Sequence, residues 1–169
     1  GEHELDSTNA WEYVTADAAE IAGLPESARE TARLDALAKG HGTEEAPQWR
    51  FTLQFTSVQP VMTFADCESL RERVWRAMGA KGTGEYDNAE LINKILSLRV
   101  EKAALLGYER YSDYVTSRRM AGSGSTALAF INNLHDRVLD AFRAEQEAIR
   151  LFAEQESGTA IPTMKPWDI

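Results

Sequence analysis

Hydrophobic residues recur every three or four positions over most of this 169-residue sequence. The spacing is clearest in residues 70–78, 92–106 and 128–152. Residues that are three or four apart lie on the same face of an α-helix, so the spacing predicts amphipathic helices. We therefore expect a mainly α protein, a multi-helix bundle whose C-terminal helix is long.

Capping residues, prolines and glycines predict where these helices begin and end. Pro25 suits the first turn of a helix, and Gly23 and Gly107 suit helix C-termini. From Pro60 onward the pattern is helical. The expected helices are a short one capped by Thr8 or Asn9, followed by residues 15–23 and 25–39. Next come a helix to residue 80 capped by Asp66 or Ser69 and one to residue 106 capped by Asp87 or Asn88. The last two are residues 110–120 and a helix to residue 156 that starts at Ser125 or Thr126.

One segment alternates between apolar and polar residues instead. Trp49, Phe51, Leu53 and Phe55 are each followed by a single polar residue, a pattern typical of a half-buried strand. We therefore expect one short β-strand or hairpin near residues 49–56. A lone strand needs a partner, and residues 40–48 are too polar to supply it. The partner strand is therefore weak, intermolecular or missing.

The length of the sequence suits one domain, or one domain with an appended helical arm. We expect residues 1–169 to be a single helical fragment of a larger protein. Its parts are N-terminal helices (1–48), a strand (49–56), a helical bundle (60–156) and a tail (157–169). A last helix of about 30 residues would be roughly 45 Å long at 1.5 Å per residue. Part of it should project from the domain or pack against something outside the sequence.

Charge and composition exclude several classes of protein. Lys and Arg number 18 against 27 Asp and Glu, a net charge of -9, whereas nucleic-acid binding needs a concentrated basic patch. No stretch is long and apolar enough for a membrane span, and the acidic start of the sequence lacks a signal-peptide core. Cys67 is the single cysteine, so no internal disulfide forms and a cytoplasmic location is expected. Flanked by Asp66 and Glu68, it is expected to be packed or unreactive rather than nucleophilic.

The three histidines do not form a zinc-peptidase motif. Such a helix needs His-Glu-x-x-His, because residues four apart direct both imidazoles to one metal. His3 is followed by Glu4 but has Ser7 at the second histidine position, and neither His41 nor His135 has a second histidine near it. We therefore expect no metal-binding, cofactor-binding or catalytic residue in this chain. His135, in line with apolar residues of the last helix, is expected to be a partly buried packing residue.

Other conspicuous residues have a structural and a functional interpretation. Arg99 lies beside an apolar helix face; we favour a helix–helix anchor to Asp113 or Glu109 over a substrate-contacting arginine. Tyrosines at 108, 111 and 114 share a face, and we favour a core role over the lining of a peptide channel. The mixed charges of residues 143–156 are typical of a solvated or partner-facing surface.

Several stretches in a fixed order resemble one known family. The most specific are Asp87-Asn88, the segment from Leu98 to Tyr108, Arg119-Met120-Ala121 and Pro166-Trp167-Asp168-Ile169. Together they are similar to zinc oligopeptidases of the thimet oligopeptidase family, in particular the bacterial oligopeptidase A and peptidyl-dipeptidase branch. The resemblance covers nearly the whole chain, and the family's zinc-binding helix lies downstream of its Pro-Trp-Asp sequence.

The resemblance implies a full-length enzyme that uses zinc to hydrolyse short peptides. The helices of this chain would then help to form the wall of a deep channel, and the chain alone would be inactive. The alternative is a stand-alone helical module that binds peptides or a protein partner without catalysis. Because helices cut from a larger enzyme expose apolar surface, we also expect self-association through the Leu128–Phe152 helix.

Overall fold

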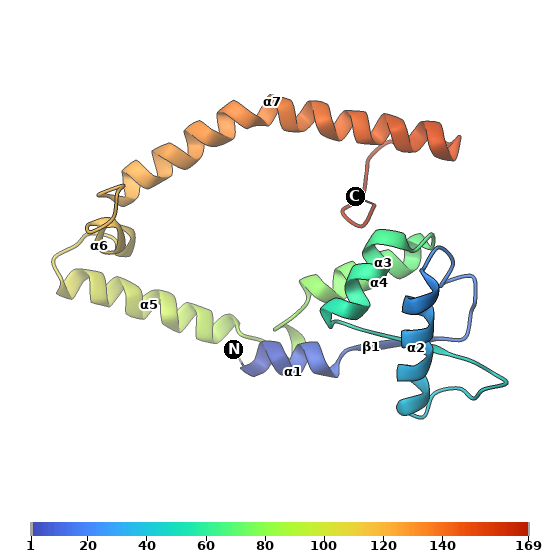
Figure 1. The fold of residues 1–169 in the computed structure, drawn as a ribbon. Coiled ribbons are helices and arrows are strands. Elements are labelled where there is room, and N and C mark those ends of the chain that lie inside the picture. Colours follow the sequence, from blue (N-terminus) through green and yellow to red (C-terminus); the bar gives the residue numbers. More distant parts are fainter. Residues whose placement is uncertain (1, 169) are drawn as a thin grey trace. The chain divides into compact units, whose positions relative to one another are not determined.

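The mainly α architecture expected from the sequence is confirmed by a computed structural model, which describes residues 2–168 (Figure 1). Gly1 and Ile169 lie outside the described residues, and Ile169 is the last residue of the Pro-Trp-Asp-Ile sequence. The described chain forms two units: residues 2–88 together with 165–168, and Ala89–Met164. The chain therefore leaves the first unit after Asn88 and returns to it at Lys165.

The first unit combines four helices with a small sheet. The elements are α1 (Glu2–Ala10), β1 (Glu12–Thr15), α2 (Glu26–Ala38), β2 (Trp49–Thr52), α3 (Phe55–Phe64), α4 (Glu68–Gly79) and a short 3-10 helix (Gly84–Tyr86). Thr8 does not cap α1 but lies inside it, where its hydroxyl donates to the Glu4 carbonyl. The expectation that Thr8 or Asn9 begins the first helix was therefore wrong.

The predicted hairpin exists, but its partner strand comes from a segment expected to be helical. β1 pairs antiparallel with β2, with Tyr13 opposite Phe51 and Val14 opposite Arg50. The strand expected at residues 49–56 ends at Thr52, because α3 begins at Phe55. The partner is neither intermolecular nor missing.

The helix expected at residues 15–23 is wrong, because this segment is a series of turns. The Thr15 hydroxyl accepts a bond from the Asp17 amide, and the Asp17 carboxylate accepts one from the Ala19 amide. Such local bonds compete with helical hydrogen bonding. Gly23 then has φ +80, and a Cβ there would lie 2.2 Å from the Phe64 carbonyl oxygen. Glycine is required at this approach of the turn to α3.

The core of the first unit lies where the turns, α2, β2, α3 and α4 meet. The core cluster consists of Ile21, Leu24, Ala32, Phe51, Val61, Ala65, Leu70 and Val74. Removing these side chains from water stabilises the unit by roughly 25 cal/mol per Å² of apolar area.

α3 begins five residues before Pro60, which lies inside the helix rather than at its start.

The second unit consists of three successive helices, α5 (Ala89–Leu105), α6 (Tyr111–Thr116) and α7 (Gly124–Ser157). α7 is the longest, as the sequence predicted (Figure 1). α5 ends in a Schellman motif: the Tyr108 amide donates to the Ala103 carbonyl and the Gly107 amide to the Ala104 carbonyl. Within the described residues, no helix is both long and apolar enough to cross a membrane.

The joint between α6 and α7 depends on Asp113. Its carboxylate accepts a bond from the Gly124 amide at 2.8 Å, at the first residue of α7. A negative charge at this position also suits the helix dipole. A Cβ on Gly124 would lie 2.4 Å from the Ser112 hydroxyl, so the helices approach closely here. Ser123 caps α7 by accepting a bond from the Thr126 amide at 3.1 Å, ahead of the start expected at Ser125 or Thr126.

Arg50 connects three elements of the first unit. From β2 its guanidinium donates to Glu12 of β1 at 2.5 Å and to Asp35 of α2. The Arg50 side chain is 10% exposed, whereas both carboxylates are about 40% exposed. The bond to Arg50 holds the pKa of Glu12 below its ordinary value of 4.5.

We predict that Arg50→Met lowers the free energy of unfolding by about 1–2 kcal/mol at neutral pH, a value reduced for the exposure of both carboxylates. Because the pKa of Glu12 is lowered by folding, its contribution is complete above its ordinary pKa and disappears as the pH falls below it. Urea denaturation should therefore show a difference between the two proteins that shrinks below pH 4.5. Arg33→Met, at an exposed pair with Glu30, is the control. An equal loss in the control would contradict the prediction.

Candidate functional site

The three histidines lie on α1, in the loop after α2 and on α7. His41 Nε2 lies 3.8 Å from Glu12 Oε1, and His135 Nδ1 lies 3.3 Å from its neighbour Asp136. His3 is exposed on α1. Across residues 2–168, no three His, Cys, Asp or Glu side chains gather as a metal site would require. The side chains present therefore do not fit a zinc centre.

Cys67 is a packing residue rather than a candidate nucleophile. It precedes α4 and packs, half-buried, against the core of the first unit. Its sulfur lies 3.2 Å from the Ser69 hydroxyl. This environment agrees with the structural role expected from the sequence.

The Pro-Trp-Asp segment is anchored to α4 through Arg71. The Arg71 guanidinium donates to the Trp167 carbonyl at 2.9 Å and to the Asp168 carboxylate at 2.8 Å. Its third nitrogen donates to the carbonyls of Ala65 and Asp66, just before α4. One planar cation thus joins the end of the described chain to the turn between α3 and α4.

The indole of Trp167 completes this anchor. It is 7% exposed and packs edge-on against Trp75, with ring centroids 5.5 Å apart. Its Nε1 donates to Glu68 at 3.3 Å, and Arg76 lies over the ring at 5.1 Å. The sequence indicated the family through this segment but gave no sign that Arg71 is its partner, because the two are 96 residues apart.

A concavity of about 670 Å³ opens in the first unit between α1 and α4. Arg73 lies in its lining and stacks on the Tyr13 ring at 4.2 Å. Arg76, also in the lining, is paired with Glu72 at 2.7 Å. Both arginines of the lining are therefore engaged with neighbouring side chains.

The three tyrosines form a cluster where α5 meets α6. Tyr114 packs against Tyr108 and Tyr111 with ring centroids 5.6 and 5.8 Å apart. Arg99 lies over the Tyr111 ring at 5.3 Å, and Lys102 over the Tyr114 ring at 5.2 Å. Arg99 therefore joins two helices, as expected, but through a cation–π contact rather than through Asp113 or Glu109.

α5 exposes apolar side chains over most of its circumference. Ala103 is its one buried residue within the described chain, although a helix of this kind normally lies inside a larger protein. Large apolar residues of α5 and the turn after it are between 49% and 88% exposed: Leu91, Ile92, Ile95, Leu96, Leu98, Val100, Leu105 and Leu106.

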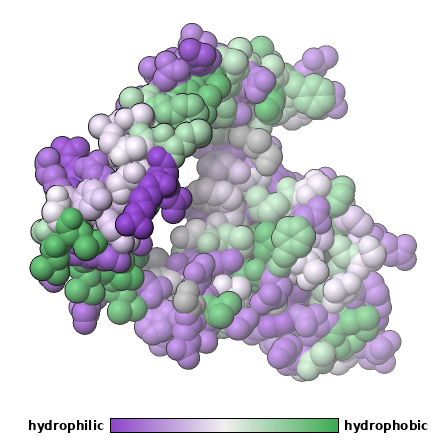
Figure 2. Space-filling view, turned by 60° about the vertical axis from the view of Figure 1, so that its left-hand side comes forward, coloured by the Kyte–Doolittle hydropathy of each residue, from purple (hydrophilic) through white to green (hydrophobic). Residues whose placement is uncertain are grey.

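α7 is amphipathic, and the other helices of the second unit leave its apolar face uncovered. No residue of α7 is buried, and hydrophobic surface follows the helix along the top of the view in Figure 2. His135 lies on this face with its side chain 63% exposed, so the partly buried histidine expected from the sequence was wrong for this unit.

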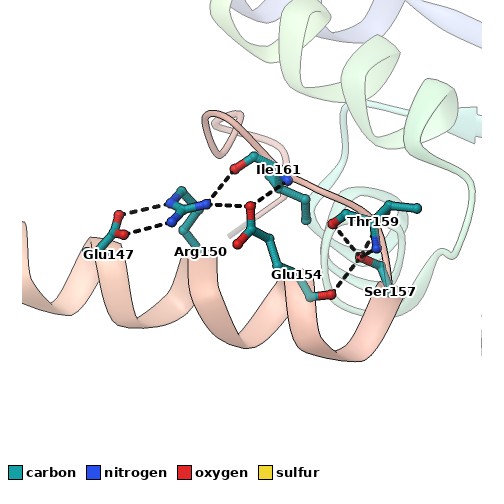
Figure 3. Close-up of polar contacts among 6 residues, drawn as sticks. All are labelled: Glu147, Arg150, Glu154, Ser157, Thr159 and Ile161. Atoms are coloured by element: carbon teal, nitrogen blue, oxygen red, sulfur yellow. Dashed lines mark hydrogen bonds and ion pairs between the residues drawn. The ribbon is translucent and has the colours of Figure 1, made fainter.

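The polar face of α7 holds the chain segment that follows it (Figure 3). Arg150 makes two bonds to Glu147, one at 2.6 Å to Glu154 and one at 2.8 Å to the Ile161 carbonyl. Glu154 in turn accepts from the Ile161 amide. The bonds to Arg150 lower the pKa of Glu147. The mixed charges of residues 143–156 thus include a specific network in addition to solvated groups.

Comparison with known proteins gives the family. The model of peptidase family M3 matches residues 61–169. The chain is 35% identical to oligopeptidase A of Haemophilus influenzae and 36% identical to that of Escherichia coli K12, over 98% of this chain and 24% of each relative. The chain belongs to peptidase family M3. It is also 36% identical, over 99% of its length, to an organellar oligopeptidase A of Arabidopsis thaliana.

Membership of family M3 confirms the resemblance of the Pro-Trp-Asp and α5 motifs. The chain spans about a quarter of the length of the bacterial relatives it matches. Most of the length of such a peptidase therefore has no counterpart in these 169 residues.

We predict that Arg71→Lys destabilises the first unit by about 1–3 kcal/mol, because one ammonium cannot reproduce the planar fork that serves four acceptors. All four tryptophans (11, 49, 75 and 167) belong to this unit, so tryptophan fluorescence in a urea titration reports it selectively. Arg73→Lys is the matched control, because a lysine can still stack on Tyr13. Equal midpoints for the two variants would contradict the proposed role of Arg71.

Arg150→Met is expected to release the segment after α7 without unfolding the rest of the helix. Hydrogen exchange should become faster at Ile161 and in the last turn of α7, while α5 remains protected. Arg143→Met is the control, since Arg143 lies 4.0 Å from Asp140 and is 69% exposed. Unchanged exchange at Ile161 in Arg150→Met would show that the network does not hold this segment.

Proposed function

We propose that this chain is a helical, channel-wall part of a zinc-dependent oligopeptidase that hydrolyses short peptides. Two facts support the proposal: its membership of peptidase family M3 and its similarity, over nearly its whole length, to a quarter of oligopeptidase A. Among residues 2–168, no group of side chains gathers as a zinc site would require, so in this proposal the metal ligands and the reacting groups come from other residues of the enzyme. The chain is therefore expected to be inactive alone.

The observation that carries the proposal is the exposure of α5. A helix that is apolar around most of its circumference loses stabilisation of the order of 1.5–3 kcal/mol for each large side chain left in water. α6 covers the end of α5 near Ala103, and the large side chains from Leu91 to Leu98 are about half exposed. α5 is therefore built for the interior of a larger protein, as expected for one part of a peptidase.

Within such an enzyme, this chain would supply surface and position rather than chemistry. The cluster of Tyr108, Tyr111 and Tyr114, held by Arg99 and Lys102, gives α6 a fixed orientation against α5. The Arg71–Trp167 anchor fixes where the chain leaves the first unit toward any residues that follow. A wall that admits only short, unfolded peptides needs this kind of rigid support.

The alternative function is a stand-alone helical module that binds peptides or a protein without hydrolysis. It predicts that the encoding reading frame ends after Ile169. A frame that continues into a His-Glu-x-x-His helix would exclude it.

We test the proposal by replacing the matching quarter of Escherichia coli oligopeptidase A with this chain. The chimaera is expected to hydrolyse short peptides in a zinc-dependent manner, and the isolated chain to show no turnover with added zinc. Ile95→Asp in the chimaera should lower activity by about tenfold or more, because it places a charge on the face that the rest of the enzyme must cover. A folded chimaera without activity, or turnover by the isolated chain, would overturn the proposal.

Glu101→Lys is the matched control for Ile95→Asp. It also changes a charge on α5, but at a polar position of the same helix, and it should leave activity unchanged. The melting transition of each chimaera, measured alongside, separates loss of folding from loss of assembly. Equal losses for the two variants would contradict the role assigned to the apolar face.

A further inference from the structure

The apolar face of α7 is interrupted by one carboxylate. Helical spacing places Glu145 on the same face as Val138, Phe142, Ile149 and Phe152. These four apolar side chains are between 38% and 64% exposed. When another surface covers the face, the Glu145 carboxylate leaves water with them, and an unpaired charge in such a place is costly. Glu145 therefore requires a partner from whatever covers α7.

Glu145 differs from neighbouring carboxylates of α7, which have cations beside them. Arg150 lies 2.7 Å from Glu147, and Arg143 lies 4.0 Å from Asp140. By contrast, the Glu145 side chain forms no ion pair or hydrogen bond within residues 2–168. Its charge is therefore not yet balanced in this part of the protein.

α7 itself does not supply the partner for Glu145. A helix offers a cation to a carboxylate from positions three and four residues away. Here these four positions are all apolar: Ala141, Phe142, Ala148 and Ile149. Arg150 lies about 140° around the helix from Glu145 at 3.6 residues per turn, and it binds the Ile161 carbonyl there. The cation must therefore come from outside α7.

His135 is a second polar residue of this face, and it makes a weaker demand. A buried imidazole can be neutral near physiological pH and then needs only hydrogen-bond partners. Its Nδ1 already lies 3.3 Å from Asp136. A carboxylate keeps its charge at neutral pH unless burial raises its pKa, so Glu145 determines the chemistry of the surface that covers α7.

A second copy of α7 does not supply this cation. α7 contains no lysine, and its arginines are at positions 137, 143 and 150. All three lie on the outer side of the helix, away from the apolar face. The chain spans 24% of the bacterial relatives that it matches, so the rest of such a peptidase is the larger source of a covering surface.

We propose that an apolar surface of the full-length peptidase, from outside these 169 residues, covers α7 from Leu128 to Phe152 and places a lysine or arginine opposite Glu145. The inference rests on the proposed function, because it requires the rest of that enzyme. The covered stretch is about 37 Å long at 1.5 Å per residue. One buried ion pair within this length fixes the register of the two surfaces, because other registers leave a charge unpaired.

The cover is tested by thiol labelling of the Escherichia coli oligopeptidase A chimaera that carries this chain. Val138→Cys places a thiol on the apolar face, and mass spectrometry of the peptide that contains it measures its reaction with a maleimide. The reaction should be about tenfold or more slower in the chimaera than in the isolated chain in dilute solution. Equal rates in an active chimaera, or slow labelling of the isolated chain, would overturn the inference.

Asp140→Cys is the matched control for the labelling. Asp140 is 96% exposed on the outer side of α7, so its cysteine should react at similar rates in the chimaera and in the isolated chain. Equal protection of the two cysteines in the chimaera would contradict a cover that is specific to the apolar face.

The cation is tested with Glu145→Leu. In the chimaera this change leaves the partner's cation buried without a counter-charge, so the melting temperature should fall by about 2 °C or more. In the isolated chain the same change should not lower it, because leucine is a good helix former. Asp140→Leu is the control and should leave the chimaera unchanged. An unchanged or higher melting temperature of the Glu145→Leu chimaera would show a purely apolar cover and overturn the pairing.

The proposed function and this inference fail in different ways. A chimaera that does not fold, or folds without activity, would overturn the proposed function and this inference with it. An active chimaera that is labelled rapidly at residue 138, or that tolerates Glu145→Leu, would overturn this inference alone.

Discussion

The second unit contains two long helices, α5 and α7, whose apolar side chains its three helices cannot bury. α5 is covered near Ala103 by α6, and α7 has no buried residue in the part of the chain that the structure describes. Each large side chain left in water forgoes a few kcal/mol of stabilisation, so these faces are complete only when another surface covers them. Membership of peptidase family M3 and coverage of a quarter of the bacterial relatives agree with this requirement.

Three arginines connect separate segments of the chain. Arg50 joins β1, β2 and α2; Arg71 joins the Trp167 segment to the start of α4; Arg150 joins the end of α7 to Ile161. Each guanidinium serves at least two acceptors from separate segments, which its planar fork allows and an ammonium does not. These directional polar contacts of the three arginines thus stabilise the chain where few apolar side chains are buried.

Period and capping predicted α4, α5 and α7, because these helices carry long apolar repeats and Gly107 lies just after α5. They placed the start of α7 too late, because Ser123 is its cap. They failed at residues 15–23, where Thr15 and Asp17 bind local amides and the partner strand of β2 lies just before. The contacts of Arg71 could not be predicted, because no local pattern joins residues 96 positions apart. The role of Arg99 as a link between helices was predicted with the wrong partner, since a guanidinium can also stack on an aromatic face.

α5 and α7 differ in what their uncovered faces specify. The exposed large residues of α5, from Leu91 to Leu106, are all apolar and need apolar neighbours. The apolar face of α7 also contains His135 and Glu145. A face that merely needed burial would be more stable with two further leucines, since polar groups in a seam reduce stability. Whatever covers α7 must therefore supply polar partners for His135 and Glu145.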